Sequence, residues 1–261
     1  MTKKPKILIS NDDGIQAPGI KALWNLLKEF SNPVVIAPHH EQSGVALSIT
    51  IRQPLRIEKH QWDEGYPVWS ISGTPADCIK LGMNVLLNEK PDMIITGINR
   101  GSNAGRNLYY SGTVAGAIEG GIQGIPSIAF SCCDDKSPNY DQTLPFIIPI
   151  IQHFLEHPLP NATILNVNFP HASAGFIKGL KFARQGKGGT WENPDCRTHP
   201  SEGKSYYWLG SRELEENEHP DSDIFLLKQG YATAVPIQIG ELTDHDQLRL
   251  RKERFEALFN K

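Results

Sequence analysis

The fold is decided by the stretch Lys6-Ile7-Leu8-Ile9-Ser10-Asn11-Asp12-Asp13-Gly14, near the start of the chain. A short, unbroken apolar run of this kind is typical of a strand buried on both faces, as in a parallel sheet. Gly14 permits a sharp turn after the two aspartates, and Pro18 suits the first turn of a following helix. The pattern therefore places Asp12 and Asp13 at the carboxyl end of a parallel strand, where open α/β sheets bind ligands.

The rest of the chain up to about residue 170 alternates strand-like and helix-like segments. Such alternation indicates βαβ units, and we therefore expect an α/β fold with a mostly parallel sheet between two layers of helices. Thr74 and Pro75 mark a helix start, as a capping residue followed by proline at the first helical position. The other expected segments are strands at 33–38, 68–72, 93–96, 126–130 and 163–169, an extended segment at 49–57, and helices at 114–123 and 143–155.

The amino-acid composition of the sequence changes at about residue 171. Residues 171–230 are richer in aromatic residues, glycine and charge, and we expect extended hairpins projecting from the core rather than helices. A strand at 231–239 and a charged amphipathic helix at 244–259 close the chain. The predicted organisation is a core at 1–170 and, at 171–261, a hairpin arm, a strand that returns to the core and a terminal helix, within one domain overall.

Composition excludes several classes of function. A formal net charge of −3 leaves no global basic surface, so we expect no stable nucleic-acid partner. No apolar run reaches membrane-spanning length, and no signal-peptide pattern precedes the first strand, so the expected location is the cytoplasm. The four cysteines form no C-x-x-C pair, and we expect free thiols in the core: Cys78, Cys132, Cys133 and Cys196.

Polar side chains follow three of the expected strands. Asp12 and Asp13 follow the first, Ser43 lies in the loop after the second, and Asn99 follows the strand at 93–96. Because loops after parallel strands emerge at one edge of a sheet, these side chains can converge. Their oxygen atoms suit Mg²⁺ or Mn²⁺ rather than zinc, and two carboxylates balance a dication. The alternative is a solvated acidic turn with no metal.

A phosphate site is predicted beside this cluster. Ser111-Gly112-Thr113 lies at the start of a helix, where free N–H groups and the helix dipole attract anions. The three glycines of the stretch 97–105 allow a ligand to approach the backbone closely. Each feature has a plainer interpretation, in which Thr113 is only the helix cap and the glycines only form turns.

The motifs of the chain occur in a recognisable order. They are Asn11-Asp12-Asp13-Gly14, Glu41-Gln42-Ser43-Gly44, Gly73-Thr74-Pro75-Ala76-Asp77, Gly97-Ile98-Asn99-x-Gly101-x-Asn103 and Tyr110-Ser111-Gly112-Thr113-Val114. In this order they resemble the SurE family, the survival-protein nucleotidases. Two further stretches, 165–170 and 206–210, extend the resemblance to nearly the full chain.

The resemblance implies a Rossmann-like core and a metal-dependent hydrolase of nucleoside 5′- and 3′-monophosphates. One divalent cation per subunit, Mg²⁺ or Mn²⁺, would be held by Asp12, Asp13, Ser43 and Asn99. The resemblance also implies exchange of the C-terminal hairpin and helix between subunits of a homodimer or homotetramer, and it raises short polyphosphate as a further substrate.

The expected reaction is attack by a metal-activated water on the phosphomonoester, with either Asp12 or Asp13 assisting proton transfer. Phosphate would be bound by Ser111, Gly112 and Thr113, and Asn11 and Asn103 are further candidates for substrate contacts. The loops at 58–67 and 186–204 are candidates for binding the base, and His39 and His40 could touch substrate or lie in a surface loop.

Two other functions fit parts of the pattern. A phosphatase that forms an aspartyl-phosphate generally pairs its carboxylates two residues apart and adds a lysine, whereas these aspartates are adjacent and the first lysine after Asn99 is Lys136. A non-catalytic nucleotide sensor would need only the phosphate-binding half of the site. In a sensor the double aspartate would repel the anion unless a cation lay between them.

Overall fold

The computed structural model describes residues 4–190, 194–209 and 217–259, and strand β1 (Lys6–Ser10) lies well inside its main sheet. The described part of this sheet has nine strands, in the order β3 (Ile57–His60), β4 (Val68–Ile71), β2 (Asn32–Pro38), β1, β5 (Met93–Arg100), β6 (Ser127–Cys132), β7 (Thr163–Phe169), β11 (Ala232–Gln238) and β8 (Leu180–Phe182). The strands from β4 to β7 are parallel, while β3 and β11 run antiparallel to their neighbours β4 and β7. The predicted mostly parallel sheet is confirmed.

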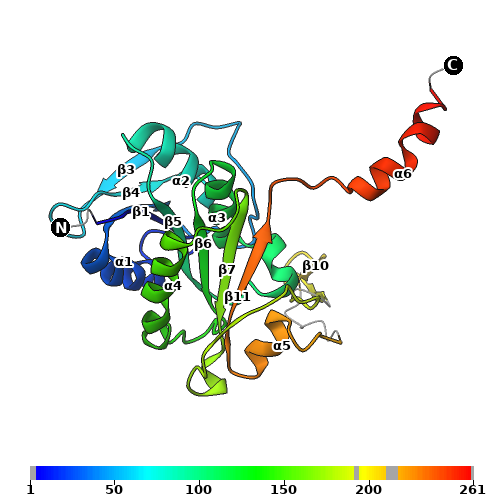
Figure 1. Ribbon diagram of the computed structural model, residues 1–261. Coiled ribbons are helices and arrows are strands. Elements are labelled where there is room, and N and C mark those ends of the chain that lie inside the picture. The colour runs from blue at the N-terminus through cyan, green and yellow to red at the C-terminus, as the bar shows by residue number, and fades with distance from the viewer. Residues whose placement is uncertain (1–3, 191–193, 210–216, 260–261) are drawn as a thin grey trace.

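Helices cover both faces of the sheet, as Figure 1 shows. The helices are α1 (Pro18–Phe30) and α4 (Leu144–Glu156) on one face, and α2 (Pro75–Leu81) and α3 (Gly112–Ile122) on the other. Side chains of β1 alternate between the two layers: Ile7 and Ile9 pack in the cluster that includes α1 and α4, and Leu8 packs against α2. All three are fully buried, which stabilises the fold by about 1.5–3 kcal/mol for each side chain.

The start of α2 matches its predicted signature. Thr74 is the N-cap and accepts a hydrogen bond from the N–H of Asp77, whose carboxylate accepts one from the N–H of Thr74. Pro75 occupies the first helical position, as expected. A π-helical turn, η1 (Gly82–Leu86), continues the helix.

The segment after residue 170 differs in part from the prediction. Residues 171–230 were expected to hold no helix, but a short one, α5 (Asp223–Lys228), begins at Ser222, whose hydroxyl accepts the N–H of Phe225 at 3.2 Å. Strand β8 pairs in parallel with β11 and so belongs to the main sheet rather than to a projecting hairpin. Among the described residues, 3₁₀ turns also occur in the connections before and after residue 170: η2 (Gly105–Tyr110), η3 (Tyr140–Gln142) and η4 (Ala172–Ala174).

The predicted C-terminal hairpin and terminal helix are both present. Strands β9 (Asp195–Thr198) and β10 (Ser205–Trp208) pair antiparallel as a separate two-stranded sheet. Helix α6 (His245–Glu256) is capped by Asp244, which accepts the N–H of Gln247 at 2.9 Å. Figure 1 shows α6 extending away from the body of the molecule, and all its side chains are exposed.

The prediction of an extended segment at 49–57 is wrong. The chain is irregular at 51–56, and the strand β3 begins only at Ile57. Pro54 has no N–H to donate to a sheet, and the N–H of Thr50 is bound by the side chain of Asp77 rather than by a neighbouring strand. These backbone groups are therefore not available for a ladder.

Two of the composition-based expectations can be compared with the structure. Cys78 and Cys132 are buried, Cys133 is half-buried and Cys196 is exposed on β9, so burial in the core holds for part of the set. None of the described helices combines the length and apolar character needed to cross a bilayer.

Replacing Gly19 with alanine should destabilise the protein by about 1–3 kcal/mol, the usual cost of overpacking. An added Cβ atom would collide with the carbonyl oxygen of Ile98 on β5, which packs against the first turn of α1. Urea unfolding of Gly19→Ala measures the loss. The exposed Asn25→Ala on the same helix is the control and should unfold near the wild-type midpoint. Equal stability of the two variants would contradict this packing.

Candidate active site

Asp12 and Asp13 lie at the carboxyl end of β1, between the loop that follows β2 and the carboxyl end of β5. The backbone carbonyl of Asp12 accepts the N–H of Gln42 at 2.7 Å, and Oδ2 of Asp13 accepts the N–H of Arg100 at 3.1 Å. Ser43 follows Gln42 and Asn99 precedes Arg100. The structure thus brings the loop with Ser43 and the end of β5 with Asn99 against the two aspartates, although the four residues are spread over nearly ninety positions. Asn99 lies within β5, which is longer than the predicted strand at 93–96, and not in the connection after it.

Ser43 and Asn99 differ in exposure. Ser43 is exposed, and its hydroxyl donates to Oε1 of Glu41 at 2.7 Å. Asn99 is buried, and its Nδ2 donates to the carbonyl of Gly101 at 2.9 Å. That bond uses the amide nitrogen of Asn99, so Oδ1 is the atom of this side chain that can bind a cation.

Burial raises the pKa of both aspartates. Asp12 is 5% exposed, and desolvation of its carboxylate, reinforced by the charge of Asp13, raises its pKa to about 7 against the opposing hydrogen bond from Thr113. Desolvation also raises the pKa of Asp13, while the N–H and guanidinium of Arg100 lower it. Two adjacent carboxylates with this burial need compensation by positive charge.

The start of α3 lies directly against Asp12. Ser111 is the N-cap of α3 and accepts the N–H of Val114 at 3.1 Å, so the interpretation of Thr113 as the cap is wrong. The hydroxyl of Thr113 instead donates to Oδ1 of Asp12. A Cβ atom at Gly112 would lie 2.7 Å from Cβ of Asp12 and 3.2 Å from the carbonyl of Gln42, so only glycine fits there. The positive end of the helix dipole therefore lies beside a buried carboxylate.

Asn11 shapes the turn that presents the aspartates. It is fully buried, and its Nδ2 donates to the carbonyl of Gly14 at 2.9 Å. Its Oδ1 is also buried and has no hydrogen-bond partner among the described residues. A buried acceptor of this kind normally pairs with water or a ligand.

Asn103 anchors the glycine-rich loop to the sheet. Its Nδ2 donates to Oγ of Ser131 on β6 at 2.8 Å, and its N–H donates to Oδ1 of Asn168 on β7 at 2.9 Å. Nδ2 of Asn166, two residues before Asn168 on the same strand, donates to the carbonyl of Asn103 at 2.8 Å. These contacts give Asn103 a structural role beside the predicted contact with substrate.

Glu41 and Arg100 were not singled out in the sequence, but both lie beside the site. Oε1 of Glu41 accepts the Ser43 hydroxyl and lies 3.5 Å from Nη2 of Arg100, so one carboxylate joins the loop after β2 to the end of β5. The sequence feature that could have identified them is a charged residue within two positions of a candidate ligand. Glu41 lies two positions before Ser43, and Arg100 directly follows Asn99.

The donor set fits a hard divalent cation. It combines two carboxylates, a hydroxyl and an amide oxygen, which are the groups that Mg²⁺ and Mn²⁺ prefer. The positive charge of such a cation would offset the unfavourable burial of two adjacent carboxylates. In the described residues, no group of three or more His, Cys, Asp and Glu side chains could hold a metal, so a site rich in nitrogen or sulfur is not formed there.

A cavity of about 460 Å³ lies at the same edge of the sheet, farther along toward β7. Its lining includes Ser102 and Asn107 from the connection after β5, Ser173 after β7, and Gly188. The N–H and hydroxyl of Thr190, also in the lining, both donate to Oδ1 of Asn107, at 2.8 and 3.0 Å. The first residues of the predicted base-binding segment 186–204 therefore border this cavity, which has the size of a small-molecule pocket.

Most of the other predicted base-binding loop, 58–67, lies at the edge of the sheet opposite the aspartates. β3 runs antiparallel to β4, and His60 pairs with Val68 at the amino end of β4, so the connection between them emerges opposite Asp12. Asp63 lies 3.4 Å from Lys28 near the end of α1, which fixes the loop there. Glu58, at the start of this segment, lies on β3 beside the carboxyl end of β4, where His39, directly after β2, contacts it at 2.9 Å.

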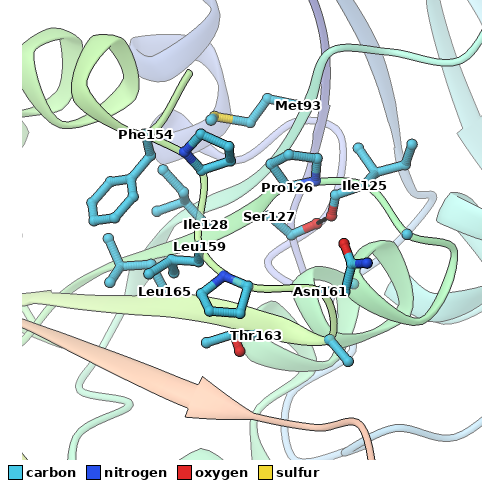
Figure 2. A pocket seen from close by; sticks show the side chains of 15 residues that line it. Met93, Ile125, Pro126, Ser127, Ile128, Phe154, Leu159, Asn161, Thr163 and Leu165 are labelled. Atoms are coloured by element: carbon cyan, nitrogen blue, oxygen red, sulfur yellow. Dashed lines mark hydrogen bonds between the residues drawn. The ribbon is translucent and has the colours of Figure 1, made fainter. Parts of the chain in front are cut away.

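A second, smaller cavity of about 280 Å³ also lies at the amino ends of the strands. Figure 2 shows its mostly apolar lining, with Phe154 and Leu159 from α4 and the segment after it, and Ile128 from β6. Asn161 lies at its rim. Because the aspartates are at the opposite edge, this cavity is separate from the candidate active site.

The family model, the related sequences and the solved structure that match this chain all belong to the same family. The family model described as "Survival protein SurE" matches residues 7–192. The chain is 51% identical to a 5′-nucleotidase SurE of Protochlamydia amoebophila over the full length of both, and 41% identical to that of Thermosipho africanus over 96% of this chain and 97% of the relative. The crystal structure of the SurE protein from Aquifex aeolicus has a TM-score of 0.82 at 36% identity, covering 96% of this chain and all of that chain.

Replacing Thr113 with valine should lower the free energy of unfolding by about 1–3 kcal/mol, the cost of leaving a buried charged group without a hydrogen bond. Valine has nearly the shape of threonine but cannot donate to Asp12. Urea unfolding at neutral pH measures the effect, and Thr113→Ser, which keeps the hydroxyl, should recover most of the loss. If valine and serine give the same stability, the contact with Asp12 contributes nothing.

Proposed function

This chain belongs to the SurE family and is a 5′-nucleotidase, a phosphoric monoester hydrolase, and we propose that its activity depends on one divalent cation held at the carboxyl edge of the sheet. The substrates are nucleoside 5′-monophosphates, and we propose that 3′-monophosphates are also hydrolysed. The products are the nucleoside and phosphate.

One observation supports the proposal most directly: two adjacent carboxylates, one of them buried, lie between the loop after β2, which carries Ser43, and the end of β5, which carries Asn99. Asp12 and Asp13 would hold the cation together with Ser43 and Asn99. When bound, Mg²⁺ or Mn²⁺ would lower the pKa of a water molecule and neutralise charge on the phosphoryl group. The contacts of Asp12 with Gln42 and of Asp13 with Arg100 support the convergence of these two segments.

The start of α3 supplies the anion-binding part of the site. Ser111 and Thr113 are already engaged by α3 and by Asp12, so in this proposal they orient the aspartate as well as the substrate. Gly112 exposes backbone where any other residue would carry a side chain against Asp12. Its N–H and the helix dipole would therefore bind the phosphate oxygens beside the cation.

The nucleoside would occupy the 460 Å³ cavity at the same edge. The glycine-rich loop connects the two places, because Asn99 lies at its beginning and Ser102 and Ala104, farther along it, line the cavity. Ile224 and Leu227 from α5 add apolar surface to the lining. This combination of apolar surface with a few polar groups is typical of sites that bind small molecules.

The family resemblance also suggests association into a homodimer or homotetramer. The exposed apolar side chains of the terminal helix support this part of the proposal: Leu250 is 74% exposed and Phe255 is 63% exposed. Short polyphosphate is a second proposed substrate class, which rests on the resemblance alone.

Replacing either aspartate with asparagine should lower kcat for AMP by about 10²–10⁴-fold, the range that loss of a charge-stabilising or proton-transferring group costs. The assay measures phosphate release with Mn²⁺ supplied. Treatment of the wild-type enzyme with EDTA should abolish release, and excess Mn²⁺ should restore it.

The matched control is Asp63→Asn, an exposed carboxylate in the connection at the opposite edge of the sheet, and it should keep wild-type kcat. Wild-type turnover by Asp12→Asn or Asp13→Asn would show that the site is assigned wrongly. An inactive but well-folded wild-type protein under every divalent metal would favour a nucleotide sensor. A trapped aspartyl-phosphate would favour the covalent mechanism.

Replacing Ser173 with tryptophan should raise KM for AMP about tenfold while leaving hydrolysis of p-nitrophenyl phosphate unchanged. The larger side chain would fill the cavity proposed for the nucleoside, and p-nitrophenyl phosphate has no nucleoside to place there. Steady-state kinetics with both substrates make the comparison. Asn161→Trp, at the rim of the cavity in Figure 2, is the control and should alter neither KM. Equal KM changes for both substrates, or none, would place the nucleoside elsewhere.

A further inference from the structure

The loop at 41–50, which carries Ser43, is not held in place by apolar packing. It has no regular secondary structure, and Leu47 and Ile49 are 42% and 47% exposed. Two of its residues, Gly44 and Ala46, have positive φ angles of 72° and 51°. A loop of this kind has many alternative conformations, so specific hydrogen bonds must define the position of Ser43.

Hydrogen bonds fix this loop at three places. Its start is bound by the N–H of Gln42, which donates to the carbonyl of Asp12 at 2.7 Å. Its middle is bound by the N–H of Ala46, which donates to the carbonyl of Tyr110 at 3.1 Å, directly before the start of α3. Its end, after Ser43 in the chain, is bound to the first turn of α2.

Asp77 makes most of the contacts at this third place. The residue is 3% exposed, and its carboxylate accepts the N–H of Thr50 at 3.0 Å and the hydroxyl of Thr50 at 2.7 Å. The same carboxylate accepts the N–H of Thr74 at 3.0 Å. The hydroxyl of Thr74 donates to the carbonyl of Ser48 at 2.7 Å. The capping box of α2 therefore binds two residues of the loop in addition to closing its own helix.

These contacts exceed what helix capping requires. A capping box needs only the two reciprocal bonds between Thr74 and Asp77. The additional bonds to Ser48 and Thr50 connect α2 to the loop that carries Ser43. Gly73 makes room for this arrangement, since a Cβ atom there would lie 2.5 Å from Oδ2 of Asp77.

We propose that Asp77 is a positioning residue for the nucleotidase reaction, which acts by fixing the end of the loop at 41–50 through Thr50 and Thr74. The bound loop holds Ser43 beside Asp12 and Asp13. This inference rests on the proposed function, in which Ser43 is a cation ligand.

The direct test is Thr50→Val, which removes the hydroxyl bound by Asp77 and leaves the capping box intact. Isothermal titration calorimetry with Mn²⁺ should show binding weakened by about 10-fold, as expected if loss of the Thr50 hydroxyl lowers the fraction of molecules with the loop in its binding conformation to about one tenth. The urea midpoint should stay near that of the wild type. In kinetics, the Mn²⁺ concentration for half-maximal activity should rise by the same factor, with kcat at saturating Mn²⁺ largely kept.

Two variants complete the test. Thr50→Ser keeps the hydroxyl and should restore Mn²⁺ binding to the wild-type value. Ile151→Val, on the buried face of α4, lowers stability without touching the loop and should leave Mn²⁺ binding unchanged. A loss of Mn²⁺ affinity in Ile151→Val as large as that in Thr50→Val would show a general effect of stability and overturn the inference.

Failure of the inference can be told from failure of the proposed function. If the wild-type protein binds Mn²⁺ through Asp12 and Thr50→Val binds it equally well, only the role of Asp77 is wrong. If the wild-type protein does not bind Mn²⁺, or Asp12→Asn binds it as tightly, the proposed cation site and this inference are both overturned.

Discussion

The structure around the candidate active site depends on one costly arrangement, a carboxylate buried beside a second carboxylate. Asp12 is almost completely removed from water, and burial raises its pKa to about 7. The surrounding groups reduce this cost: Thr113 donates its hydroxyl, and the start of α3 directs its dipole toward the charge. A cation at this point would provide the remaining compensation, which is why the same pair of aspartates is suited to binding a metal.

The order of the strands explains how distant residues reach this point. β1 lies between β2 and β5, so the loops after its two neighbours emerge on either side of Asp12 and Asp13. α3 follows the second of these loops, and its first turn completes the site. The capping box of α2 binds the far end of the first loop. The site therefore combines a rigid sheet edge with irregular loops that are held by hydrogen bonds.

Much of this architecture could be predicted from local pattern. The apolar run before Asn11-Asp12-Asp13-Gly14 indicated β1 and its buried position, and Thr74 with Pro75 indicated the start of α2. The placement of Ser43 and Asn99 at the same edge of the sheet could also be predicted, because parallel strands end at the same edge. The C-terminal hairpin and helix were visible as a change in composition and a final charged segment.

What could not be predicted depends on tertiary contacts. The direction of β3 decides that the loop at 58–67 lies opposite the aspartates, and nothing in that loop's own residues indicates it. The contact of the Thr113 hydroxyl with Asp12, about a hundred positions away, could not be predicted from the residues around the start of α3. Helix α5 is only six residues long and has no periodicity to detect. Glu41 and Arg100 can be recognised as part of the site only from the contact between them.

The central claim is that oxygen atoms of Asp12, Asp13, Ser43 and Asn99 surround one hard dication. Anomalous diffraction from crystals soaked in Mn²⁺ tests it most directly. The account predicts a single strong peak at the carboxyl end of β1, with oxygens of these four residues at coordination distance. A peak at another place, or one that contacts the aspartates while Ser43 and Asn99 point elsewhere, would contradict it.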